Sequence, residues 1–190
     1  MKDSCRLTEQ AKQYLTKFYE ILDRMVEEMT SAELTDSISY NFIVQMIPHH
    51  QAAIAMAKNI LLYTQNKNME KIACNIISMQ TKSIEDMQHI LHRCSKGCNP
   101  IDDLRLYQRR MDSIMHSMFC KMDQAQETNR VDVDFMCEMI PHHEGAIQMA
   151  ENTLKYEICP ELVPILCDII SSQKKGVREM KMLLQRMGCT

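Results

Sequence analysis

The sequence predicts an all-α protein made of two duplicated three-helix units that are related by a pseudo-twofold axis and pack as one assembly. The 190-residue chain contains four Gly, five Pro, no Trp and 5% aromatic residues, so it offers few of the residues that favour strands and turns. Apolar residues recur at helical spacing in successive segments. The order of these segments also occurs twice, with an offset of 93 residues that separates His49 from His142.

Each unit is expected to contain three helices. Residues 1–96 form the first unit and residues 97–190 the second, and the expected helices of the first unit span residues 12–29, 38–63 and 69–94. The second helix has three candidate N-caps, which are Thr35, Asp36 and Ser37. A Gly- and Pro-containing linker over residues 95–100 ends the first unit, after which the same order returns without insertion or deletion.

Both units contain the stretch Met-Ile-Pro-His-His, at residues 46–50 and 139–143. At about 100° per residue, a helix places both histidines of this motif and two nearby methionines on one broad face, next to small alanines. We therefore expect two imidazoles and two thioethers to point inward together in each unit. The residues concerned are Met46, His49, His50 and Met56 in the first unit, and Met139, His142, His143 and Met149 in the second.

Pro48 and Pro141 lie inside the expected motif helices. A proline in a helix interior removes one backbone hydrogen bond and clashes with the carbonyl four residues earlier, at a cost of roughly 3 kcal/mol. The pattern predicts a kink or bulge next to the histidines. The alternative is that each proline opens a separate helix at its first turn, although the preceding Ile47 and Ile140 are poor caps.

The mixture of imidazole and thioether favours soft metal ions. Thioethers suit Cu(I) and Ag(I), and imidazole binds both, whereas zinc prefers Cys, His or carboxylate. Carboxylates near the motif differ between the units, because Gln45 in the first corresponds to Glu138 in the second. The Glu-x-x-His pairs of di-iron bundles are absent from both motifs. Ordinary core histidines bonded to a carbonyl remain the competing interpretation.

These motifs resemble a bacterial family called "domain of unknown function 305". The resemblance covers Phe-x-x-x-Met-Ile-Pro-His-His, then Ala-Ile-x-Met-Ala, and later a Gln with a Met seven residues on. It implies a ferritin-like helical bundle associated with copper or silver binding and tolerance, often in the periplasm. It also implies that the motif histidines and methionines are the ligands, with Asp134, Met87 and Met180 as secondary candidates. Asn41 replaces in the first unit the Asp that the family usually carries.

We therefore expect a protein that sequesters or transfers soft metal ions, with Cu(I) as the first choice and silver or zinc as alternatives. One rival interpretation is a metal-dependent oxidoreductase of the ferritin-like type. Another is a structural helical module whose Met-rich surface binds a partner. The sequence contains no nucleophile elbow, phosphate-binding Gly loop or dinucleotide fingerprint.

Three further groups of residues have a simpler interpretation than metal binding. The second unit contains a stripe of methionines at helical spacing, which consists of Met111, Met115, Met118 and Met122. We expect these side chains to pack in the core, because their counterparts in the first unit include Phe18 and Leu22. Cys94 and Cys98, near His89 and His92, form at most a weak half-site for zinc or copper. Cys74 and Cys167 have apolar neighbours and are expected to be buried.

Charge and hydropathy narrow the choice of partners. A net charge of −3 and a pI near 6.2 argue against nucleic acid, and no apolar run approaches the roughly 18 residues of a membrane-spanning helix. Residues 1–5 lack the apolar core of a signal peptide, so we expect nine free thiols in a reducing cytoplasm. A protein from which a signal peptide had been removed would show the same sequence features, and it would belong to the periplasm. The sequence leaves open whether the protein forms a homo-oligomer.

Overall fold

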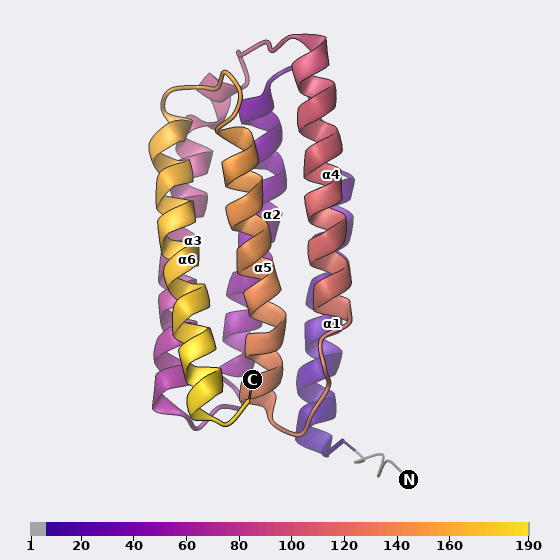
Figure 1. Ribbon diagram of the computed structural model, residues 1–190, viewed down its shortest axis with the longest axis vertical. Helices are drawn as coiled ribbons and strands as arrows, with labels where there is room; N and C mark the ends of the chain where they lie inside the picture. The colour runs from indigo at the N-terminus through magenta and orange to yellow at the C-terminus, as the bar shows by residue number, and fades with distance from the viewer. Residues whose placement is uncertain (1–6, 190) are drawn as a thin grey trace.

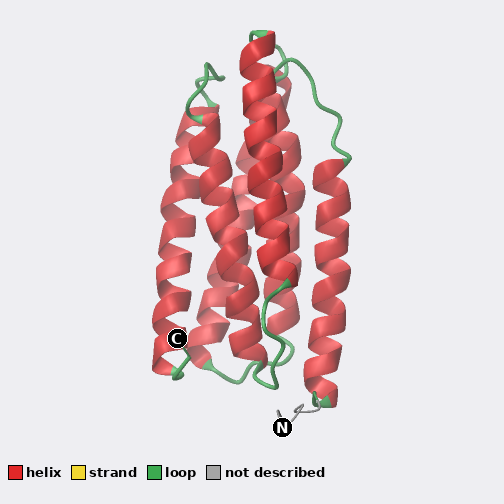
Figure 2. Cartoon of the chain, turned by 45° about the vertical axis from the view of Figure 1, so that its right-hand side comes forward, coloured by secondary structure: helices red, strands yellow, loops and turns green. Residues whose placement is uncertain are grey.

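The computed structural model describes residues 7–189, and these form an all-α fold (Figures 1 and 2). The helices are α1 (Glu9–Thr30), α2 (Ile38–Ile60), α3 (Lys67–Cys94), α4 (Ile101–Asp123), α5 (Val131–Thr153) and α6 (Leu162–Arg186). The prediction of three helices per unit is therefore confirmed. The N-terminal stretch used to assign the compartment lies outside the described residues. Within residues 7–189, no helix has both the length and the apolar character needed to cross a membrane.

The helices run along the long axis in three layers, and α2 and α5 form the middle one (Figure 1). α2 packs on α1, α3 and α5, and α5 packs on α4, α6 and α2, while α3 packs on α6. This pattern of contacts is what two three-helix units related by a pseudo-twofold axis would make. Because neighbours cover α2 and α5 on more than one side, polar side chains of these helices are buried in several directions.

Matching hydrogen bonds confirm that the two units are copies in structure as well as in sequence. Asn59 Nδ2 in α2 donates to the Tyr14 carbonyl at 3.1 Å. Asn152 Nδ2 in α5 donates to the Tyr107 carbonyl at 3.4 Å, which is the same contact one repeat later. Differences between matched positions can therefore be read as local changes on a common framework.

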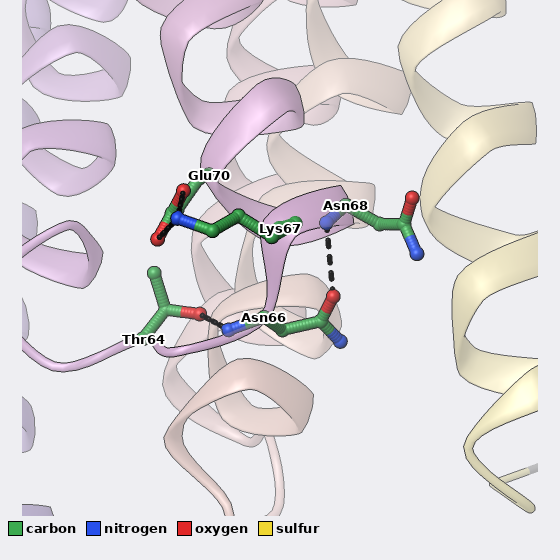
Figure 3. Close-up of polar contacts among 5 residues, drawn as sticks. All are labelled: Thr64, Asn66, Lys67, Asn68 and Glu70. Atoms are coloured by element: carbon green, nitrogen blue, oxygen red, sulfur yellow. Dashed lines mark hydrogen bonds and ion pairs between the residues drawn. The ribbon is translucent and has the colours of Figure 1, made fainter.

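Capping residues set where the helices begin. The Ser37 side chain caps α2 by accepting from the Tyr40 N–H, so one of the three cap candidates is correct. Figure 3 shows the start of α3, where Asn66 Oδ1 accepts from the Asn68 N–H at 2.9 Å. Lys67 forms an ion pair with Glu70 across the first turn at 2.9 Å. This cap starts α3 two residues before the expected position.

Both motif helices continue as α-helix through their prolines. Pro48 lies inside α2 and Pro141 inside α5, and neither helix contains a π-helical turn. The alternative that proline opens a separate helix is therefore wrong, and the expected bulge does not form. The packing of α2 and α5 against three neighbours each offsets the roughly 3 kcal/mol that an interior proline costs.

The predictions for cysteine and methionine positions have mixed outcomes. Cys74 and Cys167 are exposed, so the prediction that they are buried is wrong. Both lie on the outer sides of α3 and α6, where apolar neighbours in sequence do not imply burial. The methionine stripe is in the core as expected, since all four side chains on α4 are at most 3% exposed. The eight cysteines among the described residues are free thiols.

Candidate metal centre

The two motifs meet where α2 packs against α5. The rings of His49 and His142 stack with their centroids 3.6 Å apart and their planes at 29°. Both side chains are fully buried. The pseudo-twofold axis passes between them, because they occupy the same position in the two copies. The motifs therefore contribute to one centre in the middle of the bundle instead of two distant sites.

The second histidine of each motif points toward α3 and α6. The His50 ring centroid lies 5.8 Å from that of His49, and the corresponding distance from His143 to His142 is 5.9 Å. His50 Nε2 lies 3.1 Å from the Ser83 Oγ on α3. Both imidazoles of each motif are buried, as expected, but they face different neighbours. Adjacent helix residues are about 100° apart, and α2 and α5 are covered on more than one side.

All four motif histidines are held in the neutral form. Burial is the main cause, and it lowers the pKa of His142 to about 4 and that of His50 to about 3. The pKa of His49 and that of His143 also fall well below the usual value, through burial and through the neighbouring imidazoles. A neutral imidazole keeps one ring nitrogen with a free lone pair, which is the form that binds metal ions.

The hydrogen bond of His142 identifies which of its nitrogens is free. His142 Nε2 lies 3.1 Å from the His49 carbonyl oxygen, and a carbonyl can only accept, so Nε2 carries the proton. The lone pair is therefore on Nδ1. Among the described residues, no protein group hydrogen bonds to the buried Nδ1 of any motif histidine. An unpaired buried acceptor costs about 1–3 kcal/mol, which a bound cation would offset.

A thioether contacts this centre from α4. The Sδ of Met118 lies 3.3 Å from Nε2 of His49. Metal–nitrogen and metal–sulfur bonds of about 2.0 and 2.3 Å, as in zinc sites, could span such a gap. Met118 belongs to the stripe that the sequence assigned to core packing alone, so sequence reasoning missed it as a functional candidate.

Gly145 on α5 provides the space for this sulfur. A Cβ at Gly145 would overlap the Met118 Sδ and lie 2.9 Å from its Cγ. The matched residue in the first unit is Ala52. A glycine in a helix interior costs roughly 0.5–1 kcal/mol relative to alanine, so its presence here was a signal of close packing that could have been read from the sequence.

The motif methionines are buried in the same core as the histidines. Each of the six predicted thioethers is at most 1% exposed; they belong to Met46, Met56, Met87, Met139, Met149 and Met180. The helix positions of Met46 and Met139 place them one turn before the motif histidines. The soft donors that the sequence singled out are therefore inside the bundle and shielded from water.

The carboxylates near the motifs have other partners. Asp134 accepts from the backbone N–H and the hydroxyl of Thr128, so it stabilises the turn before α5 as Asn41 does in the first unit. Glu138 Oε2 accepts from the Tyr14 hydroxyl at 2.5 Å. Within residues 7–189, no three His, Cys, Asp or Glu side chains are grouped to hold a metal ion.

The proposed half-site of Cys94 and Cys98 does not form. The Cys94 thiol is buried against Cys159, and burial is the main reason that its pKa rises to about 12. The Cys98 thiol instead hydrogen bonds to Asp36, which raises its pKa. Because the two thiols have different partners, they do not share a ligand.

Comparison with known proteins agrees with the fold and the motifs. The family model "Domain of unknown function (DUF305)" matches residues 23–184. The solved structure of CopM in the Ag-bound form, obtained by soaking, is 32% identical with a TM-score of 0.58, and the match covers 82% of this chain and 98% of CopM. CopM in the Cu(I)-bound form is 29% identical with a TM-score of 0.58, covering 82% of this chain and 99% of CopM.

A more distant structure shares the fold. The crystal structure of a DUF305 fragment from Deinococcus radiodurans is 24% identical with a TM-score of 0.58, and the match covers 78% of this chain and 96% of the fragment. No curated protein sequence matches the chain. Since the family model spans most of the sequence, and the family motif occurs in both units, the chain belongs to the DUF305 family.

Proposed function

We propose that the protein binds Cu(I) or Ag(I) at the centre of the bundle and sequesters or transfers these ions. The observation that carries the proposal is the stacked pair of His49 and His142 with the Met118 sulfur 3.3 Å from a ring nitrogen. The buried thioethers of Met46 and Met139 complete the donor set. CopM, a relative with similar length and fold, has been solved with silver and with copper bound.

The charge of the donor set favours a monovalent ion. Imidazoles with a lowered pKa and thioethers are all neutral donors, and burying a cation among neutral groups becomes more costly as its charge rises. Thioether sulfur is a soft ligand that suits Cu(I) and prefers it to oxygen-binding ions. The protein supplies a dry, neutral and soft environment, which suits storage or transfer of Cu(I) or Ag(I).

Replacing His49 and His142 together by Ala is expected to remove the central site. Anaerobic titration of Cu(I) against a chromophoric chelator should show a lower stoichiometry than in the parent protein. Histidine ring signals in ¹H–¹⁵N spectra should shift on Cu(I) addition in the parent, because ring nitrogens then bind the metal. This second measurement separates histidine ligation from binding by the cysteines, which both proteins share.

The double variant His89→Ala with His92→Ala is the matched control, since both histidines are exposed on α3. It should take up as much Cu(I) as the parent. If the His49→Ala, His142→Ala protein is folded and still binds Cu(I) with the parent's stoichiometry and affinity, the central site is wrong and the cysteines hold the metal.

Met118→Leu tests the role of the thioether. Leucine keeps nearly the same volume and lacks the sulfur, so stability should change by less than about 1.5 kcal/mol. Affinity for Cu(I) should fall at least about tenfold. Loss of a residue that only supports a metal ligand already lowers metal affinity about 10- to 100-fold, and a direct ligand should matter at least as much. Met122→Leu on the same buried stripe is the control and should bind like the parent. Equal affinities in the two variants would show that Met118 is only a packing residue.

A further inference from the structure

A groove between α3 and α6 leads from the surface to the second histidine of each motif. It encloses about 430 Å³, and both His50 and His143 line it. The groove lies on the opposite side of α2 and α5 from α1 and α4 (Figure 1). The first histidine of each motif therefore lies in the closed centre, and the second histidine lies at the floor of an open groove.

Two buried amides in this groove have unused acceptors. Gln80 on α3 and Gln173 on α6 are matched residues that line the groove, and each is 3% exposed. The Oε1 atom of each is buried and has no hydrogen-bond partner among the described residues. Because an unsatisfied buried acceptor is costly, two of them beside two imidazoles point to a cation.

The charged groups at the groove favour a cation as well. Three carboxylates line it, those of Asp86, Asp168 and Glu179, against two ammonium groups, those of Lys82 and Lys175. Lys82 pairs with Asp86, and Lys175 lies 3.9 Å from Glu179, so these charges largely cancel. The carboxylate of Asp168 leaves the groove with a net negative charge.

The two halves of the groove differ at the matched position that lies against the second histidine of each motif. The Oγ of Ser83 on α3 lies 3.1 Å from Nε2 of His50, so this ring nitrogen has a hydroxyl as its hydrogen-bond partner. The matched residue on α6 is Gly176, which has no side chain to bind His143. A Cβ at Gly176 would lie 2.9 Å from Cδ2 and 3.0 Å from Nε2 of His143, closer than real Cβ contacts. The backbone of Gly176 therefore packs closely on the His143 ring, and no hydroxyl bonds Nε2 of His143 from this position as that of Ser83 bonds His50.

We propose that this groove is a second, outer cation site, in which His143 and Gln173 bind a borderline divalent ion such as Ni(II). Imidazole nitrogen and amide oxygen suit such ions, whereas the thioethers of the centre suit Cu(I). The outer site does not depend on metal binding at His49 and His142. Gly176 is a positioning residue, because it packs on the His143 ring without placing a side-chain hydroxyl against Nε2.

Gly176→Ser is the sharpest test, because it places in the second unit the residue that the first unit already accommodates at Ser83. The protein's thiols would reduce Cu(II), so the probe is Ni(II), which also favours imidazole and oxygen donors. In the parent, Ni(II) should broaden the ring signals of His143 through its unpaired electrons. In Gly176→Ser the apparent affinity measured by this broadening should fall about 10- to 100-fold, as for other changes next to a metal ligand.

Three companion variants decide between explanations. Ser83→Gly should add broadening of His50, because it frees the matched nitrogen. His49→Ala with His142→Ala should keep the broadening of His143, so failure of the central site and failure of the groove site give different results. If Gly176→Ser does not fold, Gln173→Leu takes its place: it removes the amide ligand, keeps the His143 ring as the reporter, and should weaken the broadening of His143 by Ni(II).

Several results would overturn the groove site. One is equal Ni(II) affinity in the parent and in a folded Gly176→Ser variant. Another is broadening limited to the exposed histidines, His89, His92 and His116. Loss of the His143 effect in the His49→Ala, His142→Ala variant would show that the ion sits at the central pair instead.

Discussion

Lowering the pH from 7 to 5 is expected to remove most of the stability of the metal-free protein. The four motif histidines are buried, and burial is the main cause that lowers the pKa of each of them in the folded state. The folded protein therefore resists taking up protons that the unfolded chain accepts near pH 6.5. The stabilisation is complete above this pH and is lost as the pH falls toward about 4, where His142 is protonated in the fold.

The expected size of this loss is large. One pH unit corresponds to about 1.4 kcal/mol for each proton that only the unfolded chain binds, so at pH 5 each histidine costs roughly 2 kcal/mol. Four such residues give about 8 kcal/mol, which is comparable with the 5–15 kcal/mol that stabilises a typical domain. The raised pKa of Glu138 makes its own contribution to the unfolding free energy increase between pH 7 and pH 5, but one carboxyl does not offset the loss from four imidazoles.

Urea denaturation at pH 7, 6 and 5 would measure this dependence in the absence of metal. The His89→Ala, His92→Ala variant should give the same curve of unfolding free energy against pH, because both side chains are exposed on α3 and the four buried motif histidines are unchanged. An unfolding free energy that stays constant from pH 7 to pH 5 would mean that the motif histidines are protonated within the fold, and it would contradict their burial as neutral groups.

The architecture could be predicted because its signals lie along the chain. Helical periodicity gave the six helices, and the offset between His49 and His142 gave the duplication. Ser37 was among the three cap candidates because a polar side chain before an apolar run has few other roles. These features depend on neighbours in sequence, which is why the sequence could predict them.

The composition of the site could be predicted only in part. The motif histidines are buried, and His49 meets His142, but Met118 reaches them from α4, which packs on α5, and no periodicity within one helix reveals such a contact. The different neighbours of His49 and His50 depend on α2 being covered on more than one side. Cys74 was misplaced for a related reason, because the face of α3 that is buried depends on where α6 packs.

Glu138 is the residue that departs most from the symmetry of the core. It is 2% exposed on α5, and the matched residue on α2 is the neutral Gln45. Burial, with a contribution from Asp134, raises the pKa of Glu138 to about 8, although the bond from the Tyr14 hydroxyl lowers it. A carboxyl with a raised pKa costs the fold nothing below its usual value of 4.5 and progressively more as the pH rises to about 8.

Glu138→Gln is therefore expected to stabilise the protein, and most strongly at high pH. The cost of keeping a proton on Glu138, or of burying its charge, grows by about 1.4 kcal/mol per pH unit and reaches on the order of 4 kcal/mol. Glutamine has the same length, carries no charge and can still accept from the Tyr14 hydroxyl. The variant should gain several kcal/mol of unfolding free energy at pH 8.5 and about 2 kcal/mol less at pH 6.5, where the neutral motif histidines still leave the protein folded.

The mirror substitution Gln45→Glu provides the matched control, because it introduces the same carboxyl at the equivalent place in the first unit. It should destabilise the protein more at pH 8.5 than at pH 6.5. Urea denaturation of both variants and the parent at the two pH values decides the matter. A gain in Glu138→Gln of equal size at both pH values would mean that improved packing, and not the removal of an ionisable group, stabilises the core. A gain that is larger at pH 8.5 would identify the buried carboxyl as a cost that the second unit bears next to the motif residue Met139.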